Sequence, residues 1–146
     1  MSERVNLTPD DLGIDVASGT PQQLYRWFLA SILFGKPIQQ GVAAATYRAL
    51  LDHGLTSPAA FDRFGREPLR RILDGGGYGR FDYQMADYLH EIMPAVKREH
   101  GSVRRMVTTS ADRATLERRM AAFTGVGKVT ARIFAERVPA RLYGTA

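Results

Sequence analysis

The residues best suited to chemistry in this chain are five in a row, Thr124-Gly125-Val126-Gly127-Lys128. The two glycines lack Cβ atoms, so the backbone can turn tightly there and approach another surface closely. The segments on both sides have the apolar period of a helix, and a helix starting after such a bend offers unpaired N–H groups and a positive dipole end. The sequence therefore predicts an anion-binding site, with phosphate as the expected ligand. The helical period is carried by Leu116, Met120 and Phe123 before the bend, and by Val126, Thr130, Ile133 and Phe134 after it.

The positive charge of the chain gathers around this bend. The net charge is +5 at pH 7, but residues 97–146 hold eleven Lys and Arg against four Asp and Glu, while residues 1–96 hold nine against eleven. Such asymmetry indicates a polyanion as partner. Arg104, Arg105 and Arg118 could extend a track of phosphate contacts from the bend. The alternative is that Arg118 and Arg119 form the solvated face of a helix.

The bend fits the pattern hydrophobic-x-Gly-hydrophobic-Gly-basic-x-x-Ala, which starts here at Phe123 and ends at Ala131. In this respect it resembles the helix-hairpin-helix DNA-repair fold of the endonuclease III type, the HhH-GPD family. Residues 21–38, PQQLYRWFLASILFGKPI, resemble the first apolar helix of that family and the loop after it. Residues 75–89, GGGYGRFDYQMADYL, resemble its glycine-tyrosine turn and next helix. Three elements in the family's order are more specific than the bend alone.

The resemblance implies binding of duplex DNA without sequence preference. Backbone amides of the bend and Lys128 would hold one phosphate, and Arg132 would hold it or a neighbour. Tyr78, between two glycines, would stack on a base or wedge into the duplex. A ring packed over the core explains Tyr78 equally well. The implied DNA-binding residues are Gly125, Val126, Gly127, Lys128, Val129, Thr130, Arg132 and Tyr78.

The resemblance also implies a monovalent cation, K⁺ or Na⁺, held behind the phosphate by the backbone carbonyls of Ala121, Phe123 and Val126. No other cofactor is expected. The chain has no cysteine, which excludes disulfides, thiolate metal sites and the iron–sulfur cluster of relatives. The glycines fit neither Gly-x-x-x-x-Gly-Lys-Ser/Thr nor Gly-x-Gly-x-x-Gly after a strand, so no nucleotide cofactor is expected.

The catalytic residues of such relatives are missing or changed here. Val129 stands where lyase-type members carry the catalytic lysine, and valine can neither move a proton nor attack a sugar carbon. Glu136 is the only carboxylate after Lys128 and is expected at the surface. In the base pocket, residues 33–36 lack the polar amide of relatives, and Gly77 replaces a bulky wedge. The resemblance therefore assigns no catalytic residue, and lyase activity at abasic sites is disfavoured.

Three functions remain open at this stage, and with them the question of whether the protein is an enzyme. The first, which we favour, is a reduced and catalytically degenerate relative of the repair glycosylases that binds duplex DNA. The second is an active DNA N-glycosylase of base excision repair that uses an unrecognised carboxylate, Asp82 or Asp87. The third is a protein-interaction module that kept the fold and lost DNA.

The sequence indicates a cytoplasmic protein, associated with the nucleoid if it is prokaryotic. The start of the chain is polar and acidic, unlike a secretory signal. The longest apolar run, residues 27–34, is too short to span a bilayer, so no membrane partner is expected. The oligomeric state is not fixed by any pattern, and a monomer is the default expectation.

The apolar periods predict an all-α protein of six to eight helices that are joined by short Gly/Pro loops. A single helical domain is expected over residues 20–138, and it contains the helix-hairpin-helix motif. Residues 1–19 are predicted to form an N-terminal arm, and residues 139–146 a short tail.

Particular residues predict where helices begin and end. Thr20 is expected to cap the first helix, with Pro21 at the first helical position and Gln23 completing a capping box. Pro37 is expected to open the second helix. Pro94 should kink or divide the longest one, because proline lacks the N–H that a helix interior needs.

Overall fold

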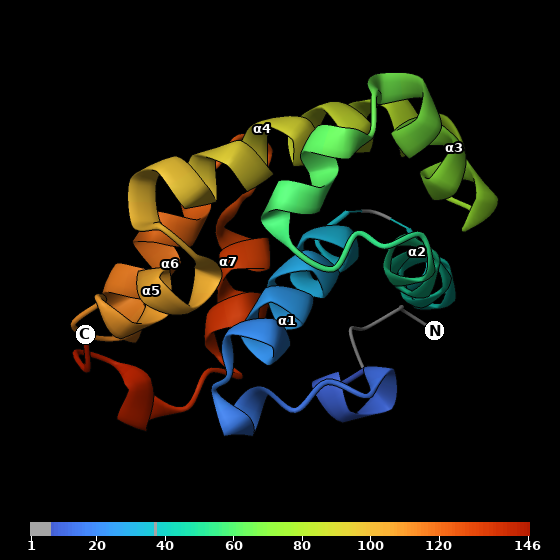
Figure 1. Cartoon of the computed structure of the whole chain (residues 1–146). Coiled ribbons are helices and arrows are strands. Elements are labelled where there is room, and N and C mark those ends of the chain that lie inside the picture. Colours follow the sequence, from blue (N-terminus) through green and yellow to red (C-terminus); the bar gives the residue numbers. More distant parts are fainter. Residues whose placement is uncertain (1–6, 37) are drawn as a thin grey trace.

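The computed structural model describes residues 7–36 and 38–146, and all regular structure in these ranges is helical (Figure 1). The prediction of an all-α protein is confirmed. The helices pack around one shared apolar core. In chain order they are η1 (Pro9–Leu12), η2 (Val16–Ser18), α1 (Pro21–Phe34), α2 (Gln40–Asp52), η3 (Pro58–Arg63), α3 (Arg66–Gly75), η4 (Gly79–Phe81), α4 (Asp82–His100), α5 (Val103–Thr108), α6 (Arg113–Ala121), α7 (Lys128–Ala135) and η5 (Ala140–Leu142), where η denotes a 3-10 helix.

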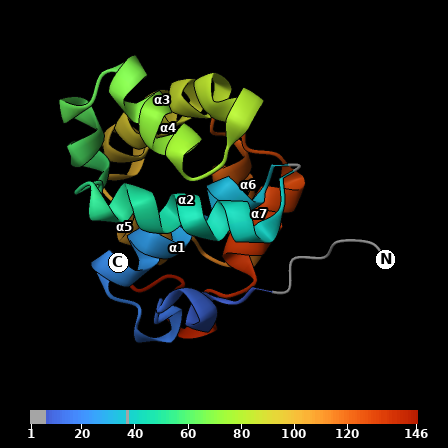
Figure 2. The ribbon, with the colours of Figure 1, turned by 90° about the vertical axis from the view of Figure 1, so that its right-hand side faces the viewer.

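Helix α1 lies at the centre and is buried on nearly all sides. Helices α2, α5 and α7 pack against it, and Figure 2 shows α2 lying across α1. A helix that is apolar all round is stable in water only when neighbours cover it, which explains this central place. No helix in the described ranges, α1 included, combines the length and the apolar character that crossing a membrane requires.

Two aromatic side chains on α1 tie it to the last helices of the chain, which lie beside it in Figure 1. Trp27 Nε1 donates a hydrogen bond to Phe134 O at 3.1 Å. The Phe28 ring meets the Phe123 and Phe134 rings edge-on, at centroid distances of 5.9 and 5.8 Å. Edge-to-face pairs of this kind add to the stabilisation from burial.

The start of α1 shows half of the predicted capping box. Thr20 Oγ1 accepts a hydrogen bond from the Gln23 N–H at 3.3 Å, and Pro21 takes the first helical position, as predicted. The Gln23 side chain instead accepts from the Asp15 N–H at 2.7 Å. The chain before α1 folds back through η2, so a competing donor comes within reach of Gln23.

Two other predicted boundaries differ from the structure. Helix α2 begins at Gln40, and Pro37, the predicted start, lies outside the described residues. Helix α4 continues through Pro94, so the prediction that this residue divides the helix is wrong. Pro94 is exposed, while its neighbours Met93 and Val96 are buried. Packing of the buried face holds α4 together across the missing N–H.

The segments that flank the predicted domain lie against the helices where the structure describes them. Ile14 and Leu142 are buried in the core. The Gly144 N–H donates to Ser110 O at 2.9 Å. Residues 1–6 of the predicted arm lie outside the described part of the chain.

The contact of α3 with α2 at Gly76 leads to a testable prediction. A Cβ added to Gly76 would lie 2.6 Å from Thr46 Cα, whereas a Cβ on Gly75 would meet nothing within 4 Å. We expect Gly76→Ala to lower the free energy of unfolding by about 1–3 kcal/mol, because the two helices must move apart. The control Gly75→Ala should leave it unchanged or raise it by up to about 1 kcal/mol. Urea unfolding followed by circular dichroism measures both, and equal effects would contradict the close contact.

Candidate nucleic-acid interface

The predicted bend, residues 122–127, joins α6 to α7. Two backbone hydrogen bonds fold it, from the Phe123 N–H to Met120 O at 3.2 Å and from the Val126 N–H to Phe123 O at 3.1 Å. Gly125 has a φ of 77°, in the left-handed region that glycine adopts without strain. Because Phe123 and Val126 are buried and the glycines are exposed, the bend is anchored by side chains and presents backbone to solvent.

Close contacts at Gly125 and at Gly35 hold the bend and α7 against the end of α1 and the middle of α4. Lys36 Nζ donates to Gly125 O at 2.9 Å, and the same ammonium lies 4.6 Å from the centroid of the Tyr88 ring. A Cβ on Gly125 would come within 2.6 Å of that ring, and a Cβ on Gly35 within 1.8 Å of Thr130 Oγ1. Both positions therefore require glycine for packing.

Lys36 is a residue of this site that the sequence did not reveal. Its side chain is half-buried, and burial lowers the pKa of its ammonium group. The local sequence around a lysine that follows a loop glycine does not predict which carbonyl will accept a hydrogen bond from its ammonium group. The useful signal was its place directly after Gly35, at the end of the first stretch that resembles the repair family.

The first turn of α7 carries N–H groups that are free to bind an anion. Gly127, its N-cap, has an extended backbone and offers no side-chain cap. The Ala131 N–H is bonded to Gly127 O at 3.0 Å. For the N–H groups of Lys128, Val129 and Thr130, no acceptor is found among the described residues. Three unpaired donors at the positive end of a helix form an anion-binding arrangement.

The side chains around this turn add positive charge and no catalytic group. Lys128 and Arg132 are exposed and form no ion pair or hydrogen bond with other described residues. Val129, between them, has 55 % of its surface exposed. Glu136, one turn further, is exposed as predicted. An anion at the free amides would therefore meet two cations and an aliphatic side chain.

Tyr78, one of the predicted DNA contacts, lies inside the protein. Its ring is only 2 % exposed, and its hydroxyl donates to Leu33 O at 3.0 Å. Burial raises the pKa of this hydroxyl above its ordinary value. The ring fills the core next to α1, as the alternative interpretation of the sequence had it, because the end of α1 supplies an acceptor for the hydroxyl.

Val126 and Thr130 offer less to a ligand than predicted. The Val126 N–H donates to Phe123 O inside the bend, so it is not a free donor for a phosphate. The Thr130 side chain is buried against Gly35, which leaves only its amide available. The predicted residues that are exposed at the bend and on α7 are Gly125, Gly127, Lys128, Val129 and Arg132.

The arginines predicted to extend the phosphate track have different surroundings. Arg105 and Arg118 are exposed. Arg104 Nε donates to Gly19 O at 3.0 Å, which binds this side chain to the segment before α1. Arg119 donates to three acceptors at the end of α5 and so joins α5 to α6. The surface track is therefore shorter than the sequence predicts.

The two carboxylates considered for catalysis hold α3 to α4. Asp82 is buried and accepts from Arg70 Nη1 at 2.9 Å. Asp87 accepts from Arg66 through two hydrogen bonds of 2.8 and 3.1 Å. The Tyr83 ring lies close to both guanidinium groups, at 4.6 Å from that of Arg66 and 4.9 Å from that of Arg70. Because both carboxylates are paired, neither is placed as a free acid or base.

The carbonyls predicted to hold a cation belong to Ala121, at the end of α6, and to Phe123 and Val126 in the bend. The Phe123 oxygen already accepts the Val126 N–H, and a carbonyl oxygen has a second lone pair that could face a cation. Within residues 7–36 and 38–146, no group of three or more His, Asp or Glu side chains could hold a metal ion. A cation at the bend would thus rest on backbone oxygens.

Comparison of the chain with protein-family models, with curated proteins and with solved structures gives no match.

The packing of Gly125 leads to a second prediction. Gly125→Ala places a Cβ against the Tyr88 ring and forces a left-handed φ on alanine, so we expect the free energy of unfolding to fall by about 1–3 kcal/mol. Gly127→Ala is the matched control, because a Cβ there meets nothing within 4 Å and φ is −97°. It should cost less than about 1 kcal/mol, the effect of a poorer N-cap. Thermal and urea unfolding measure both, and a larger loss at Gly127 would contradict this packing.

The half-buried Lys36 ammonium leads to a third prediction, on pH. Its pKa is lowered in the folded state from its ordinary value of 10.5. Between the two pKa values the unfolded chain binds more protons, so the contribution of Lys36 to stability rises with pH in that window and is constant below it. The difference in unfolding free energy between the wild type and Lys36→Met should increase accordingly toward pH 10.5. Urea titrations at several pH values measure it, and a difference that falls with pH would contradict the burial of this group.

Proposed function

We propose that the protein binds duplex DNA without sequence preference through the bend and the first turn of α7. The observation that carries the proposal is the set of three N–H groups on Lys128, Val129 and Thr130 that lack acceptors among the described residues. Amides at a helix N-terminus bind phosphate groups, and phosphate contacts position a protein on DNA without reading bases.

The surrounding charge favours a polyanion over a small anion. Lys128 and Arg132 flank the free amides, and Arg118 is exposed on α6, the helix that leads into the bend. The excess of Lys and Arg in residues 97–146 belongs to the same part of the chain. A single phosphate needs only the amides and one cation, whereas cations on both α6 and α7 suit a strand of linked phosphates.

The site supports binding rather than bond cleavage. Val129, the exposed residue beside the amides, can neither give up a proton nor attack carbon. Asp82 and Asp87 are engaged by arginines. We infer a catalytically degenerate, DNA-repair-related protein of the helix-hairpin-helix type, acting in the cytoplasm, at the nucleoid if the cell is prokaryotic.

A monovalent cation at the carbonyls of Ala121, Phe123 and Val126 belongs to the same proposal. It would place positive charge behind the bound phosphate. Backbone oxygens are hard ligands that suit alkali-metal ions, and the contact of the Lys36 ammonium with Gly125 O supports the view that carbonyls of this bend attract positive charge.

The DNA proposal predicts a salt-dependent affinity that depends on Lys128. With three or four phosphate contacts, affinity for a plain duplex should fall by roughly one to two orders of magnitude between about 50 and 200 mM salt. Lys128→Glu should weaken binding by about tenfold and reduce the salt slope by about one, on every duplex sequence. Fluorescence anisotropy with labelled duplexes measures both effects.

Arg71→Glu is the matched control, because it changes the net charge equally and Arg71 is exposed on α3, beside the end of α2 and away from the bend. It should change affinity by less than about threefold, since solvent screens distant charges. Equal losses in the two variants, or an affinity independent of salt, would contradict binding at the bend.

The cation proposal predicts a dependence on ion type. Replacing K⁺ by tetramethylammonium at constant ionic strength should weaken duplex binding, because the larger ion cannot enter a ring of carbonyls. Lys128→Glu serves as reference, since the residual binding of this variant should respond less to the exchange. Anisotropy titrations in the two salts measure the effect, and equal affinities would exclude a functional cation at the bend.

A further inference from the structure

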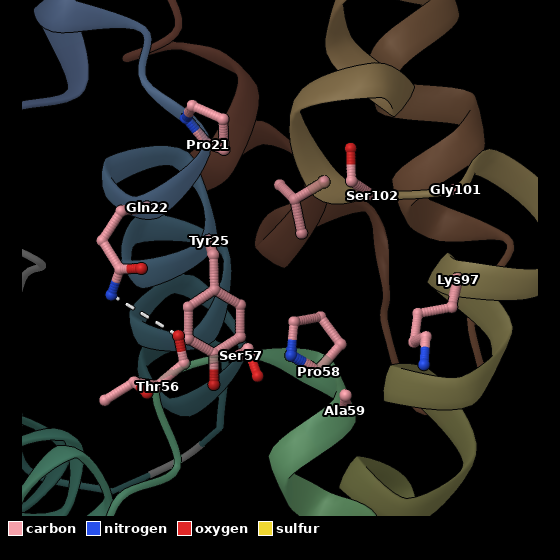
Figure 3. A pocket seen from close by; sticks show the side chains of 11 residues that line it. Pro21, Gln22, Tyr25, Thr56, Ser57, Pro58, Ala59, Lys97, Gly101 and Ser102 are labelled. Atoms are coloured by element: carbon pink, nitrogen blue, oxygen red, sulfur yellow. Dashed lines mark hydrogen bonds between the residues drawn. The ribbon is translucent and has the colours of Figure 1, made fainter.

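A pocket of about 230 Å³ lies at the end of α1 opposite to the bend (Figure 3). It is formed by the first turns of α1, the chain around the start of η3, the last turns of α4, and the start of α5. At about 30 Å³ for each water molecule in the liquid, it has room for about eight of them. Such a space suits a small organic molecule.

The inner surface of the pocket is apolar. Tyr25 and Val103 are buried core residues that line it, and the rings of Pro21 and Pro58 complete the apolar wall. The Tyr25 hydroxyl donates to Leu55 O at 2.7 Å, so it is used within the protein and the ring is fixed. An apolar ligand group would be covered here by rigid carbon surface, which favours its burial.

The rim carries hydrogen-bond donors and a positive charge. Lys97 lines the pocket from α4, and its ammonium has no ion pair or hydrogen bond with the other described residues. Ser102 Oγ accepts from the Arg105 N–H at 3.0 Å, which leaves its own hydrogen free to donate. The Ser57 hydroxyl has no partner in the described ranges. Figure 3 shows Lys97 and Ser102 across the pocket from Gln22.

None of the residues that line the pocket is acidic. A ligand with a negative group therefore meets a cation and hydroxyl donors without any repelling carboxylate. A free phosphate has no apolar part to contact the wall of the pocket, and a protonated amine would be repelled by the Lys97 ammonium. A carboxylate on an apolar body uses both parts of the surface.

We propose that this pocket binds a small organic acid, with an aromatic or branched apolar body against Tyr25 and Val103 and its carboxylate at Lys97. Charge-assisted bonds from an ammonium and a hydroxyl hold the carboxylate. The inference does not rest on DNA binding, because the pocket and the bend share no residue.

The test uses two probes of equal shape, phenylacetate and phenylacetamide, titrated into the isotope-labelled full chain and followed by amide chemical shifts in NMR. Phenylacetate should shift the amides of residues 101–103 and 57–59 and bind about tenfold more tightly than the neutral amide. The proposal would be overturned by equal affinities for the two probes or by shifts elsewhere on the protein. It would also be overturned if about 10 mM probe caused no shifts, because the Kd would then be too high for meaningful binding.

Two exposed residues supply variants that should leave the fold intact. Lys97→Gln should abolish the preference for phenylacetate over phenylacetamide while the amide still binds. Ala59→Phe, which fills the space from the rim, should weaken both probes. Lys128→Gln, at the bend, should change neither. A preference that survives Lys97→Gln would show that another group holds the carboxylate and would overturn the assignment.

Discussion

The contact of Gly125 with Lys36 and Tyr88 is the interaction on which the geometry of the interface depends. One ammonium bonds the carbonyl of the bend and lies over the aromatic ring against which the same glycine packs. A second glycine, Gly35, brings the end of α1 against Thr130 on α7. Because both contacts join backbone to side chain at van der Waals distance, they fix where the first turn of α7 points.

The core behind the bend supports this arrangement from the inside. Phe28 lies edge-on to one aromatic ring in the bend and to another on α7, and Trp27 bonds a carbonyl of α7. Rings packed in this way have little freedom to move independently. The free amides therefore belong to a rigid element, which reduces the entropy lost when a phosphate binds.

Local patterns in the sequence predicted the helices and the bend well. Tertiary contacts determined the surroundings of individual side chains, which local patterns do not predict. The helical class, the Thr20 cap and the bend at Gly125 follow from residue type and spacing, which act within a few residues. The burial of Tyr78 depends on an acceptor at the end of α1, far away in the sequence. The role of Lys36 likewise depends on a carbonyl 89 residues later, and no local pattern encodes such a partner.

The bond between Trp27 and Phe134 joins residues 107 positions apart, which bears on how the protein folds. Helices α6 and α7 are neighbours and can pair early, because closing a short loop costs little entropy. The central helix can bury its aromatic face only after the last helix arrives, so folding is slower than for a bundle of purely local contacts. The contacts that hold α7 and the bend against α1 are thus completed late.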